Sequence, residues 1–171
     1  MKTFKQYLES LKACDDAIKW AGDKPIEQVV TECHRGDWLL WLANRCGVEL
    51  QPLTLAKAHC ANTVRHLMTD ERSLIAVDVA IAFGEGRATR DELDAAAAAH
   101  AASAADAAAY AAAAYTAAAY AAAAAAAYAA AYAADADAAA ANQQQTADIC
   151  RKYIGDLIIE KVKQQLNQTN Q

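Results

Sequence analysis

The sequence predicts an all-α, single-domain bundle of helices with a long Ala/Tyr-rich helix or helical hairpin at its centre. Three features of the chain point to this class. Apolar side chains recur every three or four residues before residue 84 and after residue 148. Short turns that contain Gly, Pro or Asp separate the successive apolar segments. Between them alanine dominates residues 95–141, and alanine has the highest intrinsic helix propensity.

The length of 171 residues suggests one helical domain, residues 1–171, whose composition changes twice along the chain. Residues 1–88 hold most of the large apolar side chains and predict the N-terminal helices. Residues 89–145 form the Ala-rich helical region, and residues 146–171 predict a C-terminal helix and a tail.

The first two predicted helices are separated by a Gly-Asp-Lys turn. Residues 4–21 carry a helical apolar stripe, and Thr3 is a suitable N-cap for it. Pro25 then occupies the first position of a short helix that reaches residue 33, where its missing N–H costs nothing.

Three further helices follow before residue 88. Asp37 is expected to cap a helix over residues 38–45, which ends at Gly47. The next helix opens at Pro52 and Thr54 and reaches Leu67. Its apolar stripe consists of Leu53, Ala56, Cys60, Val64 and Leu67.

The last helix before the Ala-rich region covers residues 71–83, with Asp70 as its cap. The glycines at 84 and 86 are expected to end it.

A capping box, Thr89 to Glu92, marks the start of the Ala-rich helix. Sixty-five helical residues would run roughly 97 Å, whereas a compact chain of this length has a radius of gyration of about 15 Å. The segment therefore folds back on itself or projects and pairs with another chain. We expect a hairpin, with a bend near residues 115–116 or 135–145.

One face of this helix is predicted to be polar and aromatic, if the helix continues without a break. At 100° per residue a narrow stripe forms, which we call the Tyr/Asp stripe: Ser103, Asp106, Tyr110, Tyr128, Tyr132 and Asp135. The tyrosines either pack between helices with their hydroxyls in water or form a recognition surface, because Tyr is enriched at binding hot spots.

The C-terminal part predicts a polar hinge at residues 142–146 and a last helix with apolar positions from Ile149 to Val162. This helix is expected to fray from Gln165 onward.

The charge distribution bears on possible partners. The net charge of −5 does not favour a nucleic-acid partner. No Lys or Arg lies between Arg90 and Arg151, whereas seven acidic residues do, so this region would attract a basic protein and repel free phosphate.

Cysteine use and hydropathy bear on the cellular compartment. Five scattered cysteines with no C-x-x-C indicate reduced thiols in a cytoplasmic protein. The N-terminus opens directly into an amphipathic pattern, with no predicted signal peptide. Asp, Tyr, Thr and Ser interrupt the alanine run, so we predict no membrane span.

No catalytic motif is apparent in the sequence, which contains no Gly-rich phosphate loop, no H-E-x-x-H and no nucleophile elbow. We therefore predict that the protein is not an enzyme and needs no cofactor or metal. His59 and His66, seven residues apart, are interpreted as a solvated pair on one helix face. Cys33 and His34 have no nearby group that completes a triad.

A second cluster of informative residues surrounds the helix at 38–45. Its residues have structural roles available, since tryptophans pack and Arg45 suits a helix C-terminus. The alternative is an anchor for an anionic ligand, in which arginines bind bidentately and indoles stack. The residues of this alternative site are Arg35, Trp38, Trp41, Arg45 and Arg65.

Several segments together resemble the fifth immunity-protein family of bacterial polymorphic toxin systems, whose members also occur in phage genomes. The similar segments are Ala13 to Trp20, Arg35 to Ala43, Tyr132 to Asp137 and Ala147 to Tyr153. The resemblance spans roughly residues 8–154. It implies an all-helical, non-catalytic protein that binds and silences another molecule.

Three functions are open at this point. The first is a binding protein of immunity or phage anti-defence type, which neutralises a toxin or host-defence protein. The second is a phage sponge that sequesters a small nucleotide immune signal in a helical pocket. Ice binding is the third, and the large tyrosines and absent Thr spacing disfavour it. Close-packed Ala surfaces bury little area, so we also expect a homo-oligomer, most simply a twofold dimer.

Overall fold

The computed structural model describes residues 2–168 except 109–135, and for residues 101–108 and 136–139 it describes the backbone alone. Every secondary-structure element in this part of the chain is a helix, which confirms the all-α class. The elements are α1 Phe4–Ser10, α2 Asp15–Ala21, α3 Ile26–Glu32, α4 Gly36–Arg45, α5 Leu50–Asn62, the 3-10 helix η1 Arg65–Leu67, α6 Glu71–Gly84, α7 Arg90–Ala108 and α9 Ala136–Gln168.

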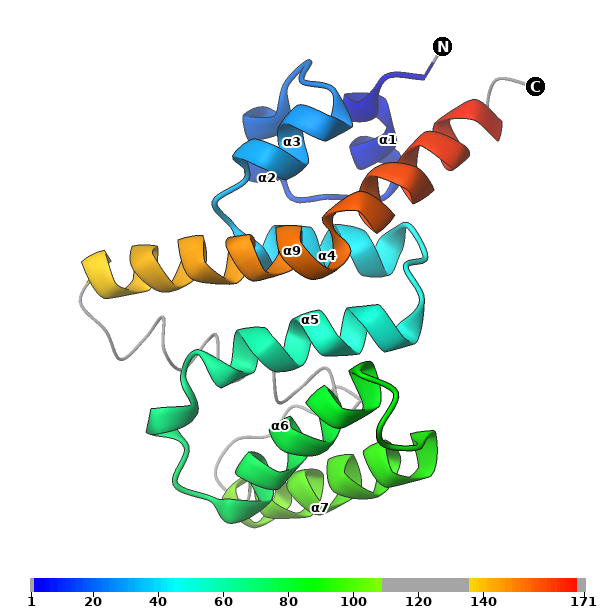
Figure 1. Ribbon diagram of the computed structural model, residues 1–171. Helices are drawn as coiled ribbons and strands as arrows, with labels where there is room; N and C mark the ends of the chain where they lie inside the picture. The colour runs from blue at the N-terminus through cyan, green and yellow to red at the C-terminus, as the bar shows by residue number, and fades with distance from the viewer. Residues whose placement is uncertain (1, 109–135, 169–171) are drawn as a thin grey trace.

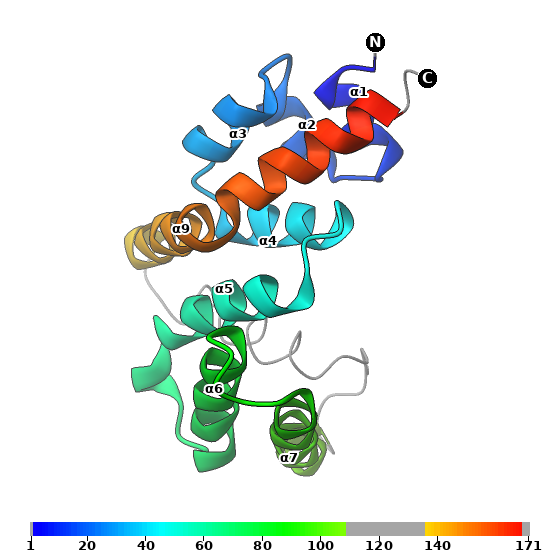
Figure 2. The same cartoon turned by 45° about the vertical axis from the view of Figure 1, so that its right-hand side comes forward.

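The helices are stacked in layers (Figure 1). Helices α1 to α3 lie at one end, next to α9 and α4, which run side by side. Helix α5 lies beneath α4 and α9, and α6 and α7 form the far end (Figure 2). Among the described helices, α5 therefore joins the α6–α7 end to α4 and α9.

The main core is organised by a buried column along α9. Its five members have no solvent exposure and follow helical spacing: Ala147, Cys150, Ile154, Ile158 and Val162. They pack against buried side chains of α1, α3, α4 and α5. A second, much smaller core lies between α5 and α6, where Ala61 and Val77 are buried against Met68 and Ile81.

Helix starts follow the predicted capping signals at three places. Thr3 and Gln6 form a capping box at α1, with N–H···O distances of 3.2 and 2.9 Å. The Asp70 carboxylate accepts the Arg72 backbone N–H at 2.8 Å. Thr89 and Glu92 exchange bonds of 2.7 and 3.2 Å and so form the predicted capping box.

The prediction of a single first helix over residues 4–21 is wrong. Helix α1 ends at Ser10, and α2 begins at Asp15. Lys12 adopts a left-handed backbone with φ 59°, and the Ala13 N–H donates to the Leu8 carbonyl at 3.1 Å. A left-handed residue after a helix terminates it and satisfies its last carbonyls, which the apolar spacing alone did not reveal.

Two predicted helix starts are displaced. α4 begins at Gly36, so Asp37 lies inside the first turn and its carboxylate binds the Arg35 side chain instead of capping. Pro25 is the N-cap of α3, whereas the sequence predicted it as the first residue inside the helix.

The predicted helix from Pro52 to Leu67 is also divided. α5 starts at Leu50 and ends at Asn62, and η1 follows. The Thr63 hydroxyl donates to the Cys60 carbonyl at 2.7 Å, a local bond that competes with a further helical turn. Leu67 therefore leaves the apolar stripe and is 55% exposed.

The polar segment at residues 142–146 is not a hinge. α9 runs without a break through the predicted boundary at residue 146, because Gln is a good helix former. Asn142 donates to the Thr63 hydroxyl at 2.9 Å, so its amide ties α9 to the end of α5.

The C-terminal fray predicted from Gln165 is wrong as well. Helix α9 continues to Gln168, and Gln165 accepts a 2.6 Å bond from the Tyr7 hydroxyl and donates to the Cys46 carbonyl at 3.0 Å.

The predicted bend at residues 115–116 lies outside the described residues, and residues 136–145 are helical. No helix in the described part of the chain is sufficiently long and apolar to span a bilayer.

Candidate functional site

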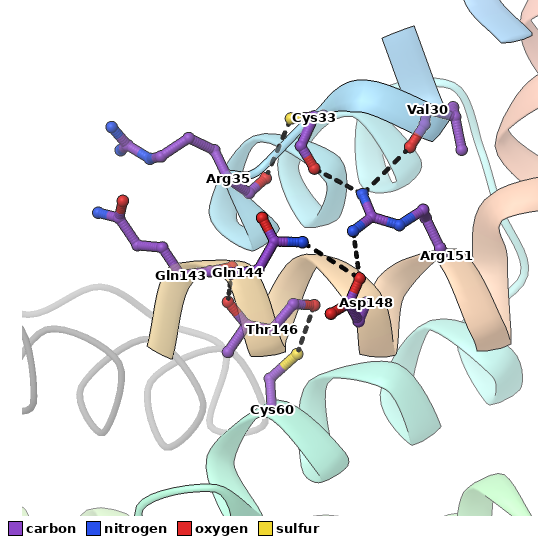
Figure 3. Close-up of polar contacts among 9 residues, drawn as sticks. All are labelled: Val30, Cys33, Arg35, Cys60, Gln143, Gln144, Thr146, Asp148 and Arg151. Atoms are coloured by element: carbon purple, nitrogen blue, oxygen red, sulfur yellow. Dashed lines mark hydrogen bonds and ion pairs between the residues drawn. The ribbon is translucent and has the colours of Figure 1, made fainter. Parts of the chain in front are cut away.

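The segment between α3 and α4 is fastened to α9 by one arginine. Arg151 Nη1 donates to the Cys33 carbonyl at 2.6 Å and to the Val30 carbonyl at 3.4 Å (Figure 3). Its other nitrogen, Nη2, binds the Asp148 carboxylate. A cation at a helix C-terminus satisfies the last carbonyls and suits the helix dipole. This contact fixes the direction in which the chain enters α4.

The start of α4 lies directly against α9 at Gly36. A Cβ atom at this position would lie 2.4 Å from the Thr146 Oγ1 and 2.7 Å from the Thr146 backbone carbon. Only glycine permits that approach. The Thr146 hydroxyl donates along its own helix, to the Gln143 carbonyl at 2.9 Å. The N-terminal turn of α4 is therefore held tightly against α9.

A cluster of aromatic and cationic side chains lies beside this turn, and we call it the tryptophan corner: Trp20, Lys24, His34, Arg35 and Trp38. The ring centroids of Trp20 and Trp38 are 6.0 Å apart, at an interplanar angle of 59°. The His34 ring meets Trp20 edge-on at 6.1 Å and 78°. Both indoles are half-buried, because one side of each packs on the main core.

A cation lies over each indole. Lys24 Nζ is 3.9 Å from the Trp20 ring centroid, and Arg35 Cζ is 4.8 Å from that of Trp38. Lys24 also pairs with Glu32 at 3.2 Å. Figure 3 shows the Arg35 side chain pointing away from the Arg151 guanidinium.

Asp37 holds the Arg35 guanidinium in place. Its two carboxylate oxygens accept bonds of 2.8 and 2.6 Å from Nε and Nη2 of Arg35. The hydrogen bonds that Arg35 donates to Asp37 raise the pKa of Arg35. Both cations of the corner are thus matched by a carboxylate, and their side chains are held in one arrangement.

The remaining residues of the predicted anionic-ligand site do not join the corner. Trp41 and Arg45 lie toward the other end of α4, with Arg45 Cζ 6.0 Å from the Trp41 ring centroid and Arg45 Nη2 donating to the Leu11 carbonyl at 3.3 Å. Arg65 lies in η1 and binds both oxygens of Asp78 in α6 at 2.6 and 2.8 Å. The structure therefore brings Arg35 to Trp38 and Arg45 to Trp41, and leaves Arg65 with α6.

The side chains of the predicted Tyr/Asp stripe lie outside the described residues. Ser103 and Asp106 belong to α7, but their side chains are outside the described residues. Tyr110, Tyr128, Tyr132 and Asp135 lie outside them altogether. The stripe stays a prediction.

Several nucleophilic or metal-binding candidates have structural roles instead. Burial raises the pKa of the Cys33 thiol, which donates to the Arg35 carbonyl at 3.4 Å. The His59 ring stacks on Tyr153 of α9 at 4.7 Å and 6°, and burial lowers the pKa of His59. His66 lies in η1, so the two histidines do not share a helix as predicted. Among the described residues no group of three metal-binding side chains is arranged to hold an ion.

Three members of the corner were absent from the predicted site: Trp20, Lys24 and His34. Trp20 and Lys24 stand four residues apart at the end of α2 and in the turn after it. A cation four positions after an indole is a recognisable cation–π pattern in sequence. Their proximity to Trp38 depends on how α2 packs near α4, which the sequence does not state.

Comparisons with known proteins found no relative of this chain. No family model matches this chain, and neither a curated protein nor a solved structure matches it. The resemblance to the fifth immunity-protein family is therefore carried by the sequence segments alone.

Proposed function

We propose that this protein is a non-catalytic binding protein of immunity or phage anti-defence type. It neutralises a partner, a toxin or a host-defence protein, by covering part of the partner's surface. The observation that carries the proposal is the tryptophan corner, in which two half-buried indoles lie 6.0 Å apart with a cation over each.

The composition and rigidity of the corner suit a protein interface. Trp and Arg are, with Tyr, the residue types enriched among side chains that dominate binding energy. The rings of Trp20 and Trp38 are held by the core on one side and by their cations on the other. Binding therefore immobilises few side chains that are free beforehand, and the entropic cost of association is reduced.

The nucleotide sponge receives less support from the geometry. A phosphate site needs several cations that converge, whereas Arg35, Arg45 and Arg65 lie in different parts of the chain. Each already donates within the fold, to Asp37, to the Leu11 carbonyl and to Asp78 respectively. A phosphate bound by Arg35 or Arg65 would have to displace a carboxylate that is bound through both oxygens.

The compartment and the assembly state belong to the same proposal. All five cysteines are free thiols and four of them are buried, which suits a reducing compartment such as the cytoplasm. The partner is a protein rather than nucleic acid or membrane, and the chain acts as a homo-oligomer.

The test compares two substitutions on one helix, Trp38→Ala and Trp41→Ala. Each removes a half-buried indole from α4 with an arginine over its ring, but only Trp38 belongs to the corner. Tagged protein is recovered from cells that carry its gene, and co-purified proteins are quantified by mass spectrometry. The recovered partner is then purified, and its affinity and activity are measured with each variant.

We expect Trp38→Ala to weaken binding by about 2 kcal/mol, roughly thirtyfold in Kd, if Trp38 is a central anchor. Trp41→Ala should leave the Kd within about threefold, since it lies outside the contact. The parent protein should abolish the partner's activity at equal concentration. Circular dichroism checks that both variants fold.

If the two variants weakened binding equally, the tryptophan corner would not be the centre of the interface. The sponge would replace our proposal if native mass spectrometry found a nucleotide on the purified protein and Arg35→Ala removed it.

A further inference from the structure

We propose that Cys60 and Cys150 form a redox-sensitive lock between α5 and α9. Oxidation joins the two thiols in a disulfide, and reduction releases them. Their Sγ atoms are 3.9 Å apart, and the two residues are 3% and 0% exposed. They are 90 positions apart in the sequence, so only the fold brings them together.

The surroundings of the pair hold the two sulfurs facing each other. Cys60 Sγ donates to the Thr146 carbonyl of α9 at 3.7 Å, and Cys150 Sγ donates to the Gly36 carbonyl of α4 at 3.6 Å. The pair therefore sits beside the tight contact of Gly36 with Thr146. A disulfide requires an S–S distance of about 2.05 Å, so the two sulfurs must move closer before the bond forms.

The position of the pair gives the lock its effect. Among the described helices, α5 joins the α6–α7 end to the α4–α9 layer (Figures 1 and 2). The core between α5 and α6 is small, with Ala61 and Val77 as its buried residues among those described. A bond from Cys60 to Cys150 fastens α5 to α9 and encloses α6 and α7 in a covalent loop. The oxidised protein therefore resists separation of α5 from α9.

The chemistry balances with a peroxide as the oxidant. One thiolate attacks a peroxide oxygen, which forms a sulfenic acid and releases the other oxygen as water after protonation. The second thiolate then attacks the sulfur of the sulfenic acid and forms the disulfide. The hydroxyl of the sulfenic acid leaves and is protonated to a second water. Each sulfur is oxidised by one electron equivalent, and both peroxide oxygens are reduced. A small dithiol reverses the bond by thiol–disulfide exchange.

Access sets the rate of the lock. The contact with Cys60 and burial raise the pKa of the Cys150 thiol, so little thiolate exists while α5 and α9 are in contact. Peroxide reaches the pair when this contact opens, and the disulfide then prevents the next opening. Oxidation is therefore slow while α5 and α9 are in contact, and it occurs mainly in molecules in which this contact has opened.

The sequence makes the test direct, because trypsin separates all five cysteines. Cys14, Cys33, Cys46, Cys60 and Cys150 fall on peptides 13–19, 20–35, 46–57, 58–65 and 91–151 respectively. The parent for the experiment is Cys14→Ser, which removes the exposed thiol and so prevents links between chains. The folded protein is treated with hydrogen peroxide, alkylated and digested without reductant.

We expect peptide 58–65 to be linked to peptide 91–151, and the melting temperature to rise by about 10 °C, because a loop of this length is closed. Dithiothreitol should reverse both changes. Cys60→Ala should abolish the link and the shift, whereas Cys46→Ala, equally buried in the same core, should keep them.

Denatured protein oxidised in urea is the control for chain proximity. There Cys60 should pair mainly with Cys46, because short loops close more readily than long ones. The proposal is refuted if the folded protein gives that same pairing, or links peptide 20–35 to peptide 91–151, or keeps four free thiols with an unchanged melting temperature.

Discussion

Replacing Gly36 by alanine should be among the most damaging single-methyl additions to this protein. The new Cβ would lie 2.4 Å from the Thr146 Oγ1 and 2.7 Å from the Thr146 Cβ and backbone carbon. Contacts between carbon atoms are favourable at about 3.5–4.0 Å, so α4 and α9 must separate by close to 1 Å. A gap of that size forfeits a quarter to a half of the dispersion energy across the contact.

The cost should be about 3 kcal/mol, at the upper end of the range for overpacked sites. This corresponds to a fall of about 9 °C in melting temperature for a chain of this size. Thr146→Ala should not rescue the variant, because two of the three clashing atoms, Cβ and the backbone carbon, remain. Urea unfolding followed by circular dichroism measures the change in free energy of unfolding.

Gly155→Ala is the matched control, since Gly155 is also a buried helical glycine in this core. Its new Cβ would meet Val30 Cγ1 at 3.4 Å and Arg151 Cβ at 3.9 Å, which are ordinary contacts. Alanine inside a helix is favoured over glycine by about 0.5–1 kcal/mol, so this variant should be stabilised. If Gly36→Ala stays within about 0.5 kcal/mol of the parent at an unchanged m-value, the contact between α4 and α9 is looser than described.

Three further predictions concern other parts of the chain. Gly84→Ala should destabilise by about 2 kcal/mol, because its Cβ would lie 2.4 Å from Leu55 Cβ and 2.8 Å from Leu55 Cα; an unchanged urea midpoint would contradict the close crossing of α5 and α6. Burial lowers the pKa of Lys57 to about 8, so between about pH 8 and 9 the folded chain releases a proton that the unfolded chain keeps, and stability should rise. Above about pH 9 stability should fall, because burial raises the pKa of Cys46 to about 11 and also raises that of Cys33, while the contact with Cys60 and burial raise that of Cys150, so the unfolded thiols ionise first and together outweigh the continuing effect of Lys57. Urea unfolding in reductant should show this maximum, and Lys57→Met should lack the rising limb. Light scattering at micromolar concentration should give the mass of a dimer, and a clean monomer would reject the proposed assembly.

The sequence predicted the helices better than their boundaries. Capping residues act locally, so Thr3, Asp70 and Thr89 were correctly assigned as helix starts. Breaks set by backbone conformation were missed, as at Lys12, because apolar spacing continues across them. The polar residues at 142–146 suggested a hinge, yet they remain helical since nothing in their backbone opposes it.

The candidate site was predicted in part for a similar reason. Arg35 and Trp38 are neighbours in sequence, so local reasoning was enough to group them, and Arg35 lies over the Trp38 ring in the structure. Arg45 and Arg65 were grouped with them by residue type, and the structure shows that each has a separate internal acceptor. Trp20 enters the corner only through the packing of α2 near α4, which no local pattern encodes.

Alanine content did not identify the helix that organises the described part of the chain. Alanine favours helix formation but buries little apolar area, whereas each fully buried Ile or Val contributes roughly 1.5–3 kcal/mol. Helix α9 carries three such side chains, Ile154, Ile158 and Val162, in one column against α1, α3, α4 and α5. The contact of α5 with α6 rests on much smaller buried groups, Ala61 and Val77. Local opening should therefore begin on the α6 side of α5, and α5 can leave α9 only by breaking the contact that places Cys60 against Cys150.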